Sequence, residues 1–247
     1  MIMNSSSLQA ELKSKLGGRL KEIYKEKFSD NLVDTVIREV SQSEKKTTIP
    51  VAKWDENNII LITYGDNIIK EGEKPLETLN KFLNKYLKNT INCIHILPFF
   101  PFSSDDGFSV IDFYSVNPEL GDWGKIKSIN RNFDLMVDLV FNHVSQKSRW
   151  FLDFLKGKSP YKDYFIKVDP ETDLSMVTRP RSSPLLTEFE TVEGKKLIWT
   201  TFSSDQVDLN MSNPEVLLEI IRILLFYVNN GARVIRLDAI AFIWKKI

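Results

Sequence analysis

The sequence predicts an α/β domain built on a parallel sheet, with a helical segment before it. Short apolar runs suited to buried strands occur at residues 59–63, 91–97, 135–141 and 233–237. Segments with helical spacing of apolar residues lie between them, near 75–88, 123–131 and 214–229. Such alternation is typical of βα units. The long connection at 144–212 interrupts it, and an excursion of this kind inside a compact domain is usually functional.

The overall charge and composition narrow the classes of partner. Of 247 residues, 43% are hydrophobic, which is ample for a buried core. Thirty-three basic residues balance thirty-three acidic ones, so the footprint of a nucleic-acid or anionic-membrane binder is missing. No apolar stretch reaches the roughly 20 residues of a membrane-spanning helix. We therefore expect a small or neutral partner.

Cysteine and histidine are scarce. Cys93 is the only cysteine, which excludes an internal disulfide and favours a reducing compartment. Residues 1–9 lack the apolar core of a secretory signal, so the predicted location is cytoplasmic. With two histidines, a three-histidine metal site cannot be built. Carboxylates become the main candidates for chemistry.

The first 56 residues predict two short helices. Their apolar residues recur at helical spacing, as Leu12, Leu16, Leu20 and Ile23, and then as Leu32, Val33, Val36, Ile37 and Val40. Near the other end, Asn213 suits the N-cap of a helix, Pro214 its first turn and Gly231 its termination. The connection at 144–212 is predicted to be irregular, with short helical pieces near 150–156 and 161–165.

Asp238 is the first candidate for chemistry. Side chains alternate along a strand, so Arg236 and Asp238 share a face, with Asp238 at the carboxyl end, where parallel folds place their sites. The guanidinium would hold the carboxylate ionised and oriented, as a nucleophile requires. The alternative is a structural ion pair.

Polar residues also follow the second and third strands. Asn142 and His143 end the third strand, where their donors suit sugar hydroxyls; alternatively the histidine caps a strand end. His95, inside the second strand, is interpreted as a core residue. The loop at 97–108 combines aromatic rings with two carboxylates and a glycine, which suits sugar binding or ordinary loop packing.

These segments resemble the α-amylase superfamily. Residues 138–143 (DLVFNH) and 231–238 (GARVIRLD) resemble its first two signature regions, and 107–121 resembles the stretch after its second strand. Residues 179–181 (RPR) and 197–208 (LIWTTFSSDQVD) are similar to the sucrose phosphorylase group, in the branch with sucrose 6-phosphate and glucosylglycerate phosphorylases. The resemblance runs from about residue 58 to the end.

The resemblance implies an incomplete TIM (β/α)₈ barrel containing strands one to four. Residues 1–56 would form a helical extension, 57–143 and 213–247 the barrel, and 144–212 an insertion after the third strand. In the family, the acid/base glutamate ends strand five and a stabilising aspartate follows strand seven. Neither has a counterpart in the sequence, so we expect a truncated chain that is inactive alone.

The resemblance also implies roles. Asp238 would be the nucleophile that forms a β-glucosyl-enzyme, Arg236 would keep it charged, and Asp138 and Asn142 would give structural support.

The substrate would be held by residues outside the fourth strand. Asp105 and His143 would bind glucosyl hydroxyls and Phe108 would stack on the ring. Arg179 or Arg181 would meet phosphate or an anionic acceptor. The implied substrate is sucrose, sucrose 6-phosphate or glucosylglycerate, with inorganic phosphate as co-substrate and no metal or other cofactor.

Two alternatives stay open. One is an α-amylase-like hydrolase that uses water in place of phosphate. The other is a non-catalytic half-barrel that binds sugar or assembles with a partner, because open sheet edges favour self-association.

Overall fold

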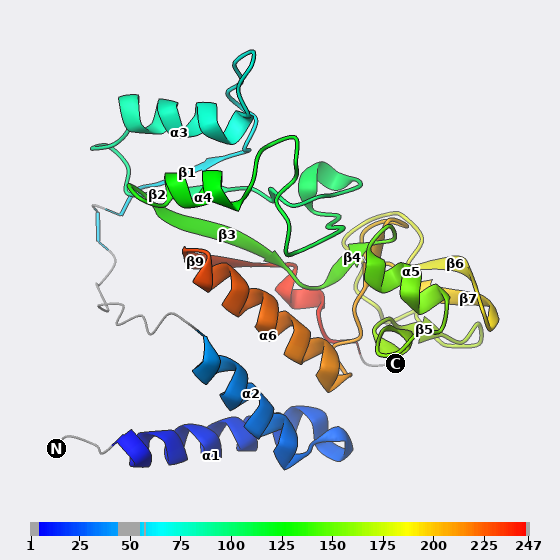
Figure 1. Cartoon of the computed structure of the whole chain (residues 1–247). Helices are drawn as coiled ribbons and strands as arrows, with labels where there is room; N and C mark the ends of the chain where they lie inside the picture. Colours follow the sequence, from blue (N-terminus) through cyan, green and yellow to red (C-terminus); the bar gives the residue numbers. More distant parts are fainter. Residues whose placement is uncertain (1–4, 44–54, 57, 246–247) are drawn as a thin grey trace.

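A four-stranded parallel sheet forms the centre of the computed structural model, which describes residues 5–43, 55–56 and 58–245 (Figure 1). Its strands are β1 (Ile60–Thr63), β2 (Cys93–Ile96), β3 (Asp134–Val140) and β9 (Ala232–Asp238), in the order β1-β2-β3-β9. Every neighbouring pair is parallel. The predicted α/β class with a parallel sheet is confirmed, and its strands fall on the four apolar runs.

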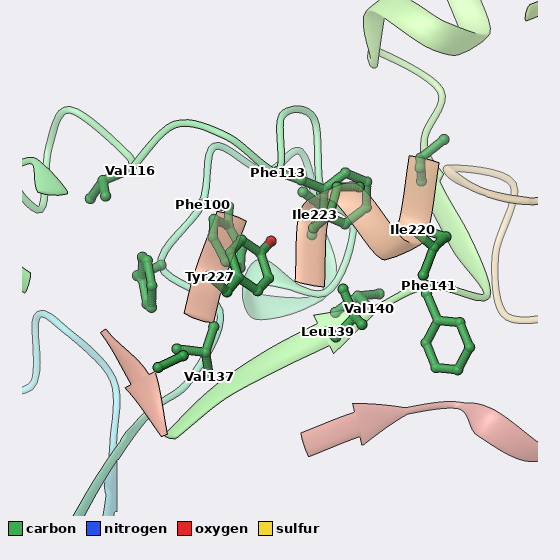
Figure 2. Packing of buried hydrophobic residues seen from close by; sticks show 14 of the residues in the cluster. Phe100, Phe113, Val116, Val137, Leu139, Val140, Phe141, Ile220, Ile223 and Tyr227 are labelled. Atoms are coloured by element: carbon green, nitrogen blue, oxygen red, sulfur yellow. The ribbon is translucent and has the colours of Figure 1, made fainter. Parts of the chain in front are cut away.

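Three helices pack against one face of this sheet: α3 (Pro75–Tyr86), α4 (Trp123–Ile129) and α6 (Pro214–Asn229). Val137 and Leu139 lie on the same face of β3 and belong to the same buried cluster as Ile223 and Tyr227 of α6 (Figure 2). The Tyr227 ring stacks on Phe100, with centroids 5.1 Å apart. This core holds the strands whose carboxyl ends carry the candidate residues.

The ends of α6 lie where the sequence predicts them. Asn213 Oδ1 accepts a hydrogen bond from the Glu215 N–H, which satisfies one free donor of the first turn. Gly231 has φ +110°, and a Cβ there would lie 2.1 Å from Asn130 Nδ2. A glycine is therefore required where the helix turns into β9.

The opposite face of the sheet is partly uncovered. Register places Ile62 beside His95, and Asp138 beside Arg236, so this face carries both apolar and charged side chains. Ile62 is 61% exposed. Among the described residues, no strand pairs with the outer edge of β1 or of β9.

The predicted amino-terminal helices are α1 (Ser5–Tyr24) and α2 (Asp30–Gln42), which lie beside α6 (Figure 1). Buried residues of this hairpin pack on Leu218: Leu20, Tyr24, Leu32, Val33 and Val36. Tyr24 Oη also donates to the Met211 carbonyl over 3.1 Å. Residues 1–4 and 44–54 of the predicted extension lie outside the described residues. None of the described helices has the length and apolarity needed to cross a bilayer.

The connection at 144–212 is more regular than predicted. The predicted helical pieces are α5 (Arg149–Leu155) and a 3₁₀ turn, Tyr161–Asp163. Strand β4 (His143–Ser145) pairs with β8 (Gln206–Asp208). Strands β5 (Lys167–Val168), β6 (Leu186–Thr191) and β7 (Gly194–Trp199) form an antiparallel sheet, so an irregular insertion was the wrong prediction. Gly194 has φ +88° and lies at the β6–β7 turn. A glycine at this point of the sequence could have indicated a β-hairpin.

Candidate active site

A cleft of about 360 Å³ opens at the carboxyl ends of the strands. That volume falls in the range of small-molecule sites. Its lining includes five of the seven predicted site residues: Asp105, Phe108, His143, Arg181 and Asp238. These residues come from loops after β2, from β4, from the insertion and from β9, so the parallel sheet brings together side chains distant in sequence.

Arg236 links two carboxylates. Its Nη2 lies 3.2 Å from Asp238 Oδ1, and its Nη1 lies 2.5 Å from Asp138 Oδ1. Asp138 is fully buried and also lies 2.6 Å from His95 Nε2. Burial raises the pKa of the Asp238 carboxyl, while the charge of Arg236 opposes that rise. The guanidinium thus orients Asp238 while compensating a second, buried charge.

The turn at Asp105–Gly107 has an unusual backbone. Asp105, Asp106 and Gly107 all have positive φ, at 56°, 48° and 102°. A Cβ on Gly107 would lie 2.6 Å from the Pro98 carbonyl oxygen, so this position admits only glycine without movement of the backbone. The turn presents Asp105 to the cleft, where its Oδ2 accepts a hydrogen bond from Gln206 Nε2 over 2.8 Å.

Residues on both sides of this turn are bonded to Asp205 of the insertion. The Asp205 carboxylate accepts hydrogen bonds from the hydroxyls of Ser103, Ser104 and Ser109, at 2.5, 2.5 and 2.8 Å. Phe108 lies against Arg236, with its ring centroid 5.8 Å from the guanidinium carbon. The loop after β2 is therefore held by contacts with the insertion, through Asp205, and with β9, through Arg236.

His143 is buried at the base of the cleft. Its Nε2 lies 3.1 Å from the Phe108 carbonyl oxygen, and its ring centroid lies 5.2 Å from that of Phe202. Desolvation by burial lowers the pKa of His143, partly opposed by the nearby Asp208 charge. The imidazole therefore bonds a backbone carbonyl and also lines the cleft, so its role in binding sugar stays a prediction.

The two arginines of the insertion are placed differently. Arg181 lines the cleft, whereas Arg179 donates from Nη2 to the backbone oxygen of Ser183. Only Arg181 is thus positioned to meet a ligand. The roles given to all seven residues stay predictions.

Sequence reasoning gave no site role to six residues that line the cleft: Tyr64, Asp106, Phe202, Gln206, Ala239 and Phe242. Tyr64 directly follows β1, so the strand-end rule that selected His143 would have found it. Phe202 and Gln206 lie in the segment 197–208, which carried the family resemblance but received no site role. Among the described residues, no group of three or more histidine, cysteine, aspartate or glutamate side chains is arranged to hold a metal ion.

The chain belongs to the α-amylase family. Its sequence matches the family described as "Alpha amylase, catalytic domain" over residues 33–247, which confirms the predicted resemblance and extends it toward the amino terminus. Within the family it is similar to glucosylglycerate phosphorylases. It is 58% identical to that of Spirochaeta thermophila over 193 residues, 78% of this chain and 33% of the relative. It is 44% identical to that of Escherichia coli over 237 residues, 95% of this chain and 42% of the relative.

The chain is also similar to a solved structure. The crystal structure of sucrose 6F-phosphate phosphorylase from Thermoanaerobacter thermosaccharolyticum matches with a TM-score of 0.71 and 34% identity. The match covers 79% of this chain and 42% of that structure. The chain thus spans between a third and somewhat over two fifths of the length of these relatives.

Proposed function

We propose that this chain carries the nucleophile and the glucose-binding face of a retaining phosphorylase that acts on glucosylglycerate. One observation carries the proposal: Asp238 opens into the same cleft as Asp105, Phe108 and His143. The choice of substrate rests on the two glucosylglycerate phosphorylases, which are 58% and 44% identical to this chain.

The proposed architecture is that of a (β/α)₈ barrel whose first four strands are β1, β2, β3 and β9. Their spatial order is their order along the chain, as a barrel requires. Residues 1–56 would be an extension and 144–212 an insertion between the third and fourth strands.

The reaction would proceed by double displacement. The Asp238 carboxylate attacks the anomeric carbon, the bond to the glycerate oxygen breaks, and a β-glucosyl ester forms. A phosphate oxygen then attacks the same carbon and breaks the ester, which releases α-glucose 1-phosphate and restores the carboxylate. The departing glycerate oxygen takes a proton from a second carboxyl group roughly 5 Å away, and that group recovers a proton from the attacking phosphate in the second step. We assign that acid/base group to the part of the relatives that this chain does not span.

The other cleft residues would bind and orient substrate. Asp105 and His143 would bind glucosyl hydroxyls, and Phe108 would stack on the sugar ring. Arg181 would bind an oxyanion, either the attacking phosphate or the carboxylate of glycerate, through charge-assisted hydrogen bonds. Inorganic phosphate is the co-substrate in this scheme, which requires no metal or other cofactor.

A chimeric enzyme tests the proposed reaction. The matched segment of the Spirochaeta thermophila phosphorylase is replaced by the corresponding residues of this chain, with the unaltered relative as control. We expect phosphate-dependent formation of α-glucose 1-phosphate from glucosylglycerate, and less from sucrose. Release of glucose with no glucose 1-phosphate would indicate a hydrolase, and a folded chimera with neither product would indicate a non-catalytic chain.

The uncovered sheet supports a second proposal, that the isolated chain self-associates. Its outer strands expose apolar side chains, with Ile62 61% and Leu237 44% exposed. Open edges of this kind pair readily with another chain. Size-exclusion chromatography is expected to show dimers or larger species across a dilution series, and a monomer at every concentration would contradict the proposal.

A further inference from the structure

Lys245 occupies a buried position behind the cleft. Its side chain is 6% exposed, and its Nζ lies 2.5 Å from Asp208 Oδ2 and 2.7 Å from Asn142 Oδ1. Asp208 and Asn142 are both fully buried. Asp208 is further held by Thr201, which donates to it from its backbone N–H over 2.7 Å and from its hydroxyl over 2.6 Å.

These two charges determine how the Asn142 amide is oriented. An ammonium group only donates hydrogen bonds, so the Asn142 atom facing Lys245 must be its carbonyl oxygen. A carboxylate only accepts them, so the amide nitrogen must face Asp208, which lies 3.0 Å away. The two contacts agree, and the amide has one orientation that satisfies both.

The orientation of Asn142 in turn determines where His143 carries its proton. Asn142 Nδ2 lies 3.2 Å from His143 Nδ1, so this ring nitrogen must accept and the proton belongs on Nε2. There the N–H donates to the Phe108 carbonyl oxygen over 3.1 Å. This tautomer satisfies both contacts. Its one mismatch is Gln206 Nε2, a donor that lies 3.2 Å from the protonated Nε2 of His143. The other tautomer satisfies Gln206 alone.

We propose that Lys245 is a positioning residue whose ammonium, acting through Asn142, holds His143 in its Nε2–H form and so orients the imidazole toward the sugar. The inference rests on the proposed function only for the sugar-binding role of His143. The ring must also be neutral, and burial lowers the pKa of His143, a direction to which the Lys245 charge adds.

The lysine is itself anchored by the fold. It follows β9 and the 3₁₀ turn Ile240–Phe242, and its neighbour Trp244 meets Tyr24 of α1 edge-on, with centroids 6.0 Å apart. The contact joins the segment after β9 to the amino-terminal helices. Removal of the ammonium would leave the buried Asp208 charge uncompensated and the Asn142 carbonyl unpaired, with the backbone still in place.

The histidine tautomers of this chain can be measured directly. His95 and His143 are the only histidines, so a ¹⁵N-histidine-labelled sample gives two sets of ring signals in a long-range ¹H–¹⁵N correlation spectrum. We expect wild-type His143 to show a protonated Nε2 and an unprotonated Nδ1. In Lys245→Met this single pattern is lost and the titration midpoint of His143 rises, because the Asp208 charge then favours the imidazolium.

Three comparisons make the test specific. His95 is the internal control, because unchanged His95 signals show that the fold is retained. Lys158→Met removes a lysine that lies 2.9 Å from Asp153 but is 57% exposed, and it should leave His143 unchanged. Asn142→Leu keeps the Lys245–Asp208 ion pair and removes only the amide that connects Lys245 to His143. If Lys245→Met unfolds, this second variant tests the proposal.

The inference is overturned if wild-type His143 carries its proton on Nδ1. It is equally overturned if a folded Lys245→Met or Asn142→Leu variant leaves the His143 signals and their titration unchanged. Since no sugar is added, either failure is separate from a failure of the chimeric phosphorolysis assay.

Discussion

Asp238→Asn in the chimeric phosphorylase is expected to lower kcat for glucose 1-phosphate formation by at least about 10³-fold. An amide is a poor nucleophile, so the β-glucosyl ester no longer forms. The side chain keeps its size beside Arg236, whose Nη2 lies 3.2 Å from Asp238 Oδ1, so binding of glucosylglycerate should change much less than turnover. Initial rates of glucose 1-phosphate release across a range of substrate concentrations measure kcat and KM separately.

Asp169→Asn provides the matched control. Asp169 is an exposed carboxylate of the insertion outside the cleft, so the same exchange there should leave both constants near those of the unaltered chimera. An Asp238→Asn enzyme that retains a tenth or more of the original kcat would exclude Asp238 as the nucleophile and leave the structural ion pair as its role.

Asp138→Ala is expected to lower the free energy of unfolding by about 3–5 kcal/mol, the usual effect of removing one partner of a buried ion pair. The Asp138 carboxylate is fully buried, 2.6 Å from His95 Nε2 and 2.5 Å from Arg236 Nη1. Its loss leaves the buried His95 without this acceptor and leaves Arg236 with Asp238 alone. Urea titration followed by tryptophan fluorescence measures the change against a total stability of roughly 5–15 kcal/mol.

The same strand offers a control for this effect. Asp134 also pairs with an arginine of β9, since Arg233 Nε lies 3.2 Å from its Oδ2, but the side chains are 44% and 41% exposed. Asp134→Ala should therefore cost no more than about 1 kcal/mol. An equal decrease in the free energy of unfolding in the two variants would show that the burial of Asp138 does not determine its contribution to stability.

Local patterns were enough to predict the central sheet and the helices that cover it. Apolar runs located β1, β2, β3 and β9 because strands buried in a parallel sheet need apolar residues on their covered face. Asn213 and Gly231 marked the ends of α6 because a free N–H and a positive φ are local requirements. The sheet within the insertion was not predicted, because its short strands are stabilised by pairing with one another. Gly194, at the β6–β7 turn, was the one local indication that we find in the sequence.

The candidate site divides in the same way. The sequence by itself determined that Asp105, His143 and Asp238 follow or end successive strands, because strand direction and side-chain alternation are properties of the local chain. It also determined the family, through segments whose residues stand in a fixed order.

Only the tertiary structure decided which partner each of these groups has. Arg236 bonds Asp138 as well as Asp238, and Gln206 reaches Asp105 from 101 positions away. Lys245 meets Asn142 across a separation of 103 residues. Spacing along the chain carries no information about such contacts, because the distance between two side chains on different strands depends on the packing of the whole sheet and its insertion.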